Sequence, residues 1–282
     1  MRFLTAILLT VALLASGDAR AAGPQRIVSA GGDITEIIYQ LGAGDRVIGL
    51  DSTSNFPADA SEKAQIGYIR RLAAEGILSL QPDLLIAAHD AGPPPALEQL
   101  RSAGLRVELA PKGDSVAGVQ EKIRFVGKVL EMPEEAEALA LKLADEMKAS
   151  LEIANANKER PRVIFVLNTA DGALLVGGTE TSADAIIALA GGVNAASGFE
   201  GYKPMSQEAI ITAAPDVLLM MSQTVNRMGN IDVMLSRPEF QLTPAGKNRR
   251  YVAMEGILLF SFGPRLPQAV RELATALQQK DG

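Results

Sequence analysis

Apolar and polar residues follow two different periods along the chain, and the period changes at regular intervals. Compact apolar runs at 26–29, 47–50, 84–88 and 105–109 are separated by segments in which apolar residues have helical spacing. Short continuous apolar runs are typical of strands that are buried on both faces of a sheet. Strands that alternate with helices indicate a parallel sheet, so the first half of the chain predicts an α/β lobe.

The segment from 116 to 158 breaks this alternation. It is rich in Ala, Leu, Glu and Lys with helical periodicity, and Pro133 lies where it can open a helix. We therefore predict one long helix over 134–156 with no strand beside it. A strand follows at 162–167, and the alternation then resumes to the end of the chain.

The two α/β halves repeat one another. Residues 75–88 read E-G-I-L-S-L-Q-P-D-L-L-I-A-A, and residues 208–221 read E-A-I-I-T-A-A-P-D-V-L-L-M-M. An acid, an apolar helix face, Pro-Asp and a strand recur at the same spacing, which indicates a duplication. The predicted fold class is α/β, with two Rossmann-like lobes whose parallel sheets are joined by a long rigid linker helix. Ligands of such paired lobes bind in the cleft between them, at the loops after the strands.

The first residues have the pattern of an export signal. Arg2 precedes an apolar run from Phe3 to Ala15, and Ala19-Arg20-Ala21 fits the small-x-small cleavage rule. An uncleaved membrane anchor is the alternative, although the run is short for a span of about 20 residues. We expect residues 1–21 to be a signal peptide that is cleaved near Ala21, and the mature protein to be periplasmic.

The expected boundaries of the mature chain are an N-terminal α/β lobe at 22–125, a helical linker at 126–158 and a C-terminal α/β lobe at 159–282. The chain has 282 residues, no Cys and a net charge of −6. Without Cys it has neither a disulfide nor a lipid-modified cysteine. The negative charge argues against nucleic-acid binding, although a few local arginines can still hold a small anionic ligand.

One stretch, G-Y-I-R-R-L-A-A-E-G-I-L-S-L at 67–80, places a tyrosine beside two arginines in a chain that has only 4 Tyr. If the backbone is extended at Tyr68, the side chains of Tyr68 and Arg70 project to the same side. A free phenol ionises near pH 10, and a nearby guanidinium favours its ionised form. This tyrosine-arginine pair is therefore a candidate binding site.

This stretch strongly resembles the haem-binding periplasmic proteins of bacterial haem ABC transporters. The Tyr-x-Arg-x-Leu-x-Ala-Glu-Gly core carries the resemblance, which extends from Arg26 to the C-terminal helix. The wider superfamily carries siderophores and cobalamin. The resemblance implies a monomeric substrate-binding protein that captures ferric haem b and delivers it to an inner-membrane ABC permease dimer with its ATPase, for haem and iron uptake. It also implies a TonB-dependent outer-membrane receptor upstream.

The resemblance implies that Tyr68 is the axial ligand of the haem iron, as tyrosinate is one of the recognised protein ligands of haem. It implies that Arg70 supports the ionised phenol. Arg227 falls where the family has a second basic residue that reaches the tyrosine from the other lobe. Arg71 is either a further support or a solvated surface charge. One five-coordinate haem is expected.

The chain departs from some relatives in its histidines. Those relatives carry a histidine in the C-lobe loop after the first strand and can stack two haems, whereas residues 167–172 contain none here. The single His, His89, either ligates the iron as a neutral imidazole or hydrogen-bonds its neighbour Asp90. We expect it to line the cleft. Further candidates for the walls of the cleft are Pro93 to Pro95, Met205, Met228 and Phe260.

Glu75 and Glu208 occupy matching places in the two repeats. The resemblance implies that both are exposed and pair with arginines on the two permease subunits. The alternative is an ordinary glutamate at a helix N-terminus, where the helix dipole favours an acid.

Two other classes of function fit the chain less well. A hydrolase would need a nucleophile elbow or a catalytic triad, but no G-x-S-x-G occurs and the chain has 1 His. No His/Cys cluster offers a zinc site, so we expect no enzyme. A carrier of a ferric siderophore or cobalamin on the same fold is the nearer alternative.

Overall fold

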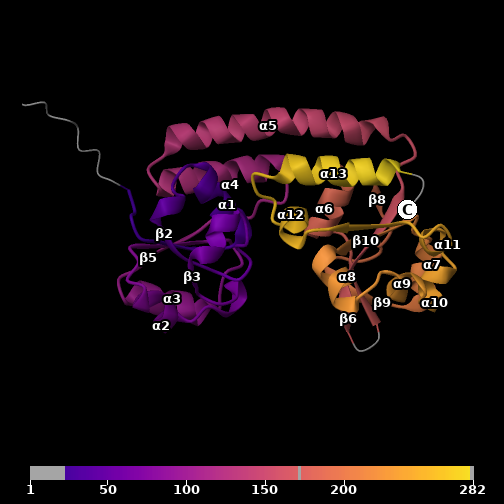
Figure 1. Ribbon diagram of the computed structural model, residues 1–282, viewed down its shortest axis with the longest axis horizontal. Helices are drawn as coiled ribbons and strands as arrows, with labels where there is room; N and C mark the ends of the chain where they lie inside the picture. The colour runs from indigo at the N-terminus through magenta and orange to yellow at the C-terminus, as the bar shows by residue number, and fades with distance from the viewer. Residues whose placement is uncertain (1–22, 171–172, 280–282) are drawn as a thin grey trace, which may run out of the picture.

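The computed structural model describes residues 23–170 and 173–279, which form two lobes joined by a helical bridge whose longer helix runs along both (Figure 1). The expected signal peptide at 1–21 lies outside the described residues. Within the described ranges, no helix is both long and apolar enough to cross a membrane.

The N-terminal lobe is built on a five-stranded parallel sheet with the order β3-β2-β1-β4-β5. Its strands are β1 Ile27–Ala30, β2 Val47–Leu50, β3 Ala64–Gln65, β4 Leu84–Ala87 and β5 Arg106–Leu109. Its helices are α1 Gly32–Gln40, α2 Ala74–Ser79 and α3 Pro94–Ser102. Every residue of β1 and β4 is buried, which confirms the prediction from their continuous apolar runs.

The bridge consists of α4 Val116–Val129 and α5 Pro133–Ala156. Helix α5 runs along both lobes, and it packs on α4 at the N-lobe end and on α13 (Leu266–Gln278) at the C-lobe end (Figure 1). Pro133 occupies the first turn of α5, where its missing N–H costs nothing. The expected long helix is thus confirmed.

The C-terminal lobe has a six-stranded sheet with the order β11-β10-β6-β7-β9, and β8 pairs with β6. Its strands are β6 Arg162–Ala170, β7 Ala173–Gly177, β8 Val193–Asn194, β9 Tyr202–Met205, β10 Val217–Met221 and β11 Tyr251–Met254. Its helices before α13 are α6 Ser182–Leu189, α7 Gln207–Ala213, α8 Ser222–Met228, α9 Asp232–Leu235, α10 Pro238–Gln241, α11 Pro244–Lys247 and α12 Gly256–Phe260.

This second sheet is only mostly parallel, because β7 runs antiparallel to both β6 and β9. The strand expected at 162–167 continues to Ala170 and enters a hairpin with β7. Successive side chains of β6 point to opposite faces of the sheet, so this strand contributes to two hydrophobic cores. Val163 and Phe165 belong to the large core that spans the molecule. Ile164 and Val166 belong to a second core within the C-lobe.

The aspartate of the repeated Pro-Asp pair makes the same contact in both lobes. Asp83 accepts from the backbone N–H of Arg26 at 3.1 Å, and Asp216 accepts from the backbone N–H of Arg162 at 2.8 Å. The Nε of each arginine also donates to a carbonyl at the C-terminal side of the helix before the Pro-Asp pair, that of Gln81 after α2 and that of Ala213 in α7. The Pro-Asp pair in each half therefore holds a helix end against the first strand of its sheet.

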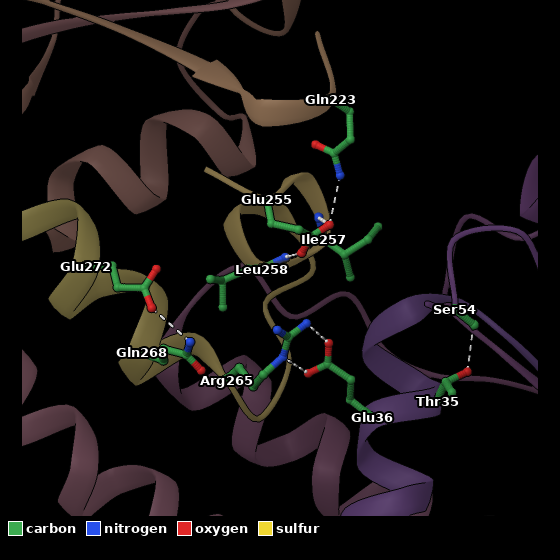
Figure 2. Close-up of polar contacts among 10 residues, drawn as sticks. All are labelled: Thr35, Glu36, Ser54, Gln223, Glu255, Ile257, Leu258, Arg265, Gln268 and Glu272. Atoms are coloured by element: carbon green, nitrogen blue, oxygen red, sulfur yellow. Dashed lines mark hydrogen bonds and ion pairs between the residues drawn. The ribbon is translucent and has the colours of Figure 1, made fainter. Parts of the chain in front are cut away.

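The lobes are joined beneath the cleft by two buried ion pairs on α1. Lys122 of α4 pairs with Asp33 and also donates to the carbonyl of Phe262 at 3.2 Å, and both charged side chains are less than a tenth exposed. Arg265 of the C-lobe reaches Glu36, with Nε donating to Oε2 at 2.9 Å (Figure 2). Burial raises the pKa of Glu36, and the bond from Arg265 opposes that rise without cancelling it.

The N-terminus of helix α1 is capped by a glycine and not by a polar side chain. Gly31, with φ of +120°, is the N-terminal cap, and neither Asp33 nor Thr35 caps the helix. A Cβ on Gly32 would lie 2.7 Å from Cγ2 of Ile257 and 2.9 Å from the carbonyl oxygen of Thr53. Glycine is therefore required where the two lobes touch.

Candidate functional site

A cavity of about 600 Å³ opens between the lobes, at the carboxyl ends of the parallel strands. This is the position at which open α/β sheets bind ligands, and its size is in the range of small-molecule sites. Its N-lobe and linker side is lined by Gly31, Gly32, Asp33, Thr53, Tyr68, Ile69, Arg70, Ala88, His89, Asp90, Lys112, Gly113, Asp114 and Lys122. Its C-lobe side is lined by Leu167, Glu180, Ser182, Tyr202, Met221, Gln223, Gly256, Ile257, Phe260, Ser261 and Phe262.

Tyr68 is presented to the cavity by a short turn after β3. Gly67 has φ of +93°, Tyr68 is extended, and residues 69–71 form a single turn of 3₁₀ helix. Ile69 is buried and anchors this turn, whereas Tyr68 is 38% exposed. The expected extended backbone at Tyr68 is confirmed, and the turn that follows brings Arg70 back toward the phenol.

Arg70 connects two groups on the cleft wall. Its NH1 donates to the phenol oxygen of Tyr68 at 3.0 Å, and its Nε donates to Oδ2 of Asp90 at 3.0 Å. Partial burial lowers the pKa of Arg70, but the bond to Asp90 and the smaller contribution of Tyr68 outweigh it, so the net shift is upward. The phenol oxygen therefore faces a permanent positive charge.

The other basic residues of the motif and of the C-lobe lie further out. Arg71 is exposed and is not part of the cavity lining. Arg227 is exposed in the last turn of α8 and does not line the cavity either. Gln223 does line it, and Arg227 lies four residues later, so the two share one face of the helix. Arg227 is thus one helical turn outside the lining.

His89 lies among the lining residues and is exposed, directly before Asp90. The carboxylate of Asp90 forms an ion pair with Arg70. On the same rim Lys112 pairs with Asp114 at 2.6 Å, and this bond lowers the pKa of Asp114. On the N-lobe rim the exposed His89 therefore lies beside two ion pairs, Arg70 with Asp90 and Lys112 with Asp114.

Of the apolar wall candidates, Phe260 lines the cavity. Its ring meets that of Phe165 edge-on, with centroids 4.6 Å apart. Met205 and Met228 instead pack against the core of the C-lobe, and Pro93 to Pro95 are outside the lining. Met221, at the end of β10, is a lining residue that the sequence analysis did not single out.

Tyr202 is the main lining residue that the sequence analysis missed. It opens β9 on the C-lobe wall and is 39% exposed, with its ring edge-on to Phe165 at 6.4 Å between centroids. Burial raises the pKa of Tyr202, and hydrogen bonding at Ala183 and Thr181 and the charge of Arg70 oppose the rise only in part. The duplication held the signal for it, since Gly201-Tyr202 precedes Glu208 much as Gly67-Tyr68 precedes Glu75.

Glu75 and Glu208 lie in the first turns of α2 and α7, one in each lobe. Both are exposed, and among the described residues neither takes part in an ion pair. Each therefore presents a free carboxylate on the surface of its lobe.

Residues 27–257 match the model of the periplasmic binding protein family. The chain belongs to that family. An uncharacterized ABC transporter substrate-binding lipoprotein, YvrC of Bacillus subtilis, is 26% identical over 90% of this chain and 80% of its own length.

Other relatives differ in the ligand that their names record. A vitamin B12-binding protein of Vibrio campbellii is 29% identical over 77% of this chain and 78% of its own. The apo structure of the periplasmic heme-binding protein RhuT of Roseiflexus sp. RS-1 is 41% identical, with a TM-score of 0.87 over 90% of this chain and 98% of its own. The heme-binding protein BhuT, solved with two hemes, is 38% identical, with a TM-score of 0.85 over 89% of this chain and 98% of its own.

These findings confirm the two-lobed fold and the resemblance to haem-binding periplasmic proteins. The relatives named here are binding proteins by their own descriptions, not enzymes. Membership of this family indicates a location outside the cytoplasm and an ABC permease as partner.

Proposed function

We propose that this periplasmic binding protein carries one ferric haem b, held by the phenolate of Tyr68. The observation that carries the proposal is the 3.0 Å bond from Arg70 to the Tyr68 oxygen on the wall of the interlobe cleft. A phenol is a poor iron ligand until it loses its proton, and a guanidinium in contact favours the ionised form. A phenolate with such support is an axial ligand suited to ferric haem.

The remaining lining residues fit the rest of a porphyrin. Phe260, Ile257 and Leu167 offer apolar surface to its ring from the C-lobe. The lining cations Arg70, Lys112 and Lys122 each pair with an aspartate. We therefore assign the attraction of its carboxylates to the exposed Arg227, one turn outside the lining. We assign His89 to the wall of the cleft and leave the iron five-coordinate through Tyr68.

Delivery completes the proposed role. We infer that the N-terminal segment exports the protein to the periplasm, that a TonB-dependent receptor supplies the haem and that the monomer passes it to the permease dimer. The free carboxylates of Glu75 and Glu208 would meet arginines on the two permease subunits. Exposed pairs of this kind affect orientation and association rate more than affinity.

Cobalamin is the second candidate cargo, because a relative 29% identical to this chain is named as a vitamin B12-binding protein. A corrinoid carries its own cobalt ligand and has no carboxylates at its rim, so the arginine-supported phenol would have no partner in it. The contact between Arg70 and Tyr68 is the reason to favour haem.

A pair of titrations tests the proposal. Purified mature protein and Tyr68→Ala are titrated with hemin and, separately, with cyanocobalamin, and visible absorbance is recorded. The proposal expects saturation at one hemin with a ferric phenolate spectrum that Tyr68→Ala loses. Saturable binding of cyanocobalamin without hemin binding would replace it, and saturation at two hemins would correct the stoichiometry.

A further inference from the structure

Asp90 is the group on the cleft wall whose role the proposed function does not explain. It lines the cavity with a carboxylate at the mouth of a site proposed to receive an anionic ligand. An unpaired carboxylate there would repel such a ligand. Its oxygen Oδ2 instead accepts from two nitrogens of Arg70, Nε at 3.0 Å and NH2 in a closer contact.

We infer that Asp90 is a positioning residue that aims the guanidinium of Arg70 at the iron-ligand oxygen of Tyr68. This inference rests on the proposed function. A guanidinium is planar, so fixing Nε and NH2 on one carboxylate oxygen also fixes the direction of the remaining NH1. That NH1 is the atom that donates to Tyr68. Without Asp90, the arginine side chain is free to turn into solvent, since it is 61% exposed.

The backbone holds Asp90 in place for this role. The loop after β4 is tied to the Tyr68 turn by two hydrogen bonds, from Gly92 N–H to the carbonyl of Ile69 at 3.0 Å and from Leu72 N–H to the carbonyl of Gly92 at 2.8 Å. These two bonds fix the position of the loop relative to the turn. Tyr68, Arg70 and Asp90 form a line of contacts across this junction.

The inference predicts a defined set of affinities. Asp90→Ala should weaken hemin binding about tenfold, at the low end for an outer partner of a metal ligand because the pair is partly exposed. Asp90→Asn, which keeps an acceptor oxygen, should lose about threefold. In the Arg70→Ala background, Asp90→Ala should cause no further loss, since it acts through Arg70.

Two further readouts separate positioning from a general structural role. In Asp90→Ala the phenolate-to-iron absorption band should move to longer wavelength, as in Arg70→Ala, because the ligand oxygen loses its hydrogen-bond donor. In the ligand-free protein, the Nε–H resonance of Arg70 in a ¹⁵N-arginine spectrum should lose its protection from exchange. The Nε–H of Arg124, which donates to Glu137 at 2.6 Å, is the reference signal.

Glu137→Gln removes a comparable carboxylate from an arginine on the bridge helices and is the matched control, which should leave the hemin affinity and the band unchanged. Equal losses from Asp90→Ala with and without Arg70 would overturn the inference. So would tighter binding by Asp90→Ala, which would mean that Asp90 competes with Tyr68 for the arginine. Failure of the wild type to bind hemin would instead overturn the proposed function, and protection of Arg70 Nε–H that persists in Asp90→Ala would refute the positioning contact independently of any haem.

Discussion

The two walls of the cleft come from duplicated halves, but they differ in charge. The N-lobe and linker side carries ionisable residues from Asp33 to Lys122, whereas the C-lobe side has only Glu180 and Tyr202 of this kind among its lining residues. The C-lobe wall is otherwise apolar or neutral. One wall of the cleft is therefore rich in ionisable side chains and the other is largely apolar.

The two tyrosines show how the difference arose. Each follows a glycine with positive φ, Gly67 at +93° and Gly201 at +76°, and each precedes the acidic residue of its repeat. Two residues after Tyr68 the N-lobe has Arg70, and two residues after Tyr202 the C-lobe has Pro204. Tyr68 faces a guanidinium at 3.0 Å, whereas burial raises the pKa of Tyr202. The two tyrosines thus differ in one nearby residue, an arginine beside Tyr68 and a proline beside Tyr202, and only Tyr68 accepts a hydrogen bond from a guanidinium at this position.

The largest effect should come from the junction that holds the two walls together. Lys122→Ala leaves the carboxylate of Asp33 buried without its partner and should lower the free energy of unfolding by about 3–5 kcal/mol. Urea unfolding followed by circular dichroism measures this. Lys148→Ala, which breaks an exposed pair with Asp145, is the control and should have little effect. If both variants lowered the free energy of unfolding equally, the buried Lys122–Asp33 pair would contribute no more to stability than an exposed pair.

The next effect tests the two tyrosines directly. Tyr68→Phe should weaken hemin binding by more than about a hundredfold, because even the outer partners of metal ligands contribute 10–100-fold. Tyr202→Phe should change the affinity by less than about threefold, since it removes one neutral hydroxyl. Isothermal titration with hemin compares both. A larger loss from Tyr202→Phe would reverse the assignment of the walls.

A smaller effect is expected from the apolar wall. Phe260→Ala removes a ring that lines the cavity and should reduce hemin affinity roughly tenfold through lost apolar contact. The phenolate band should keep its position, because Tyr68 and Arg70 are untouched. Leu242→Ala, at an exposed site of the C-lobe outside the lining, is the matched control. A shifted band in Phe260→Ala would mean that the C-lobe wall also sets the iron ligand.

The smallest effect concerns alkaline stability. Burial raises the pKa of Tyr202 above its ordinary 10.0, so the folded state keeps a proton that the unfolded chain loses. The stabilisation is complete below the unfolded pKa and is lost as pH rises through the folded pKa. Tyr202→Phe should therefore flatten the decline in the free energy of unfolding between about pH 9 and 11.

The comparison variant for this last effect is Tyr39→Phe, because burial also raises the pKa of Tyr39. Each variant should remove part of the alkaline decline, and the double variant should remove the sum. An unchanged slope in Tyr202→Phe would contradict the raised pKa of its hydroxyl.

Much of the fold could be predicted because the local spacing of apolar residues indicates its strands and helices. The buried strands Ile27–Ala30 and Leu84–Ala87 and the helix Pro133–Ala156 lie where the apolar pattern placed them. The hairpin of β6 and β7 was missed, since an apolar run alone does not tell a parallel strand from one that turns back. The contact between Asp33 and Lys122 could not be predicted from local pattern, since Lys122 lies 89 residues further along the chain.

The sequence by itself determined the two-lobed plan, its duplication and the pairing of Tyr68 with Arg70, since these depend on residues a few positions apart. Only the tertiary structure decided which side chains face the cleft: it added Tyr202 and Asp90 to the lining and left Met205 and Arg227 outside it. The physical reason is the range of the interactions. Periodicity and short-range contacts act within a strand or a turn, whereas the Arg70 contact with Asp90 and the Asp33 contact with Lys122 exist only after distant segments have packed together.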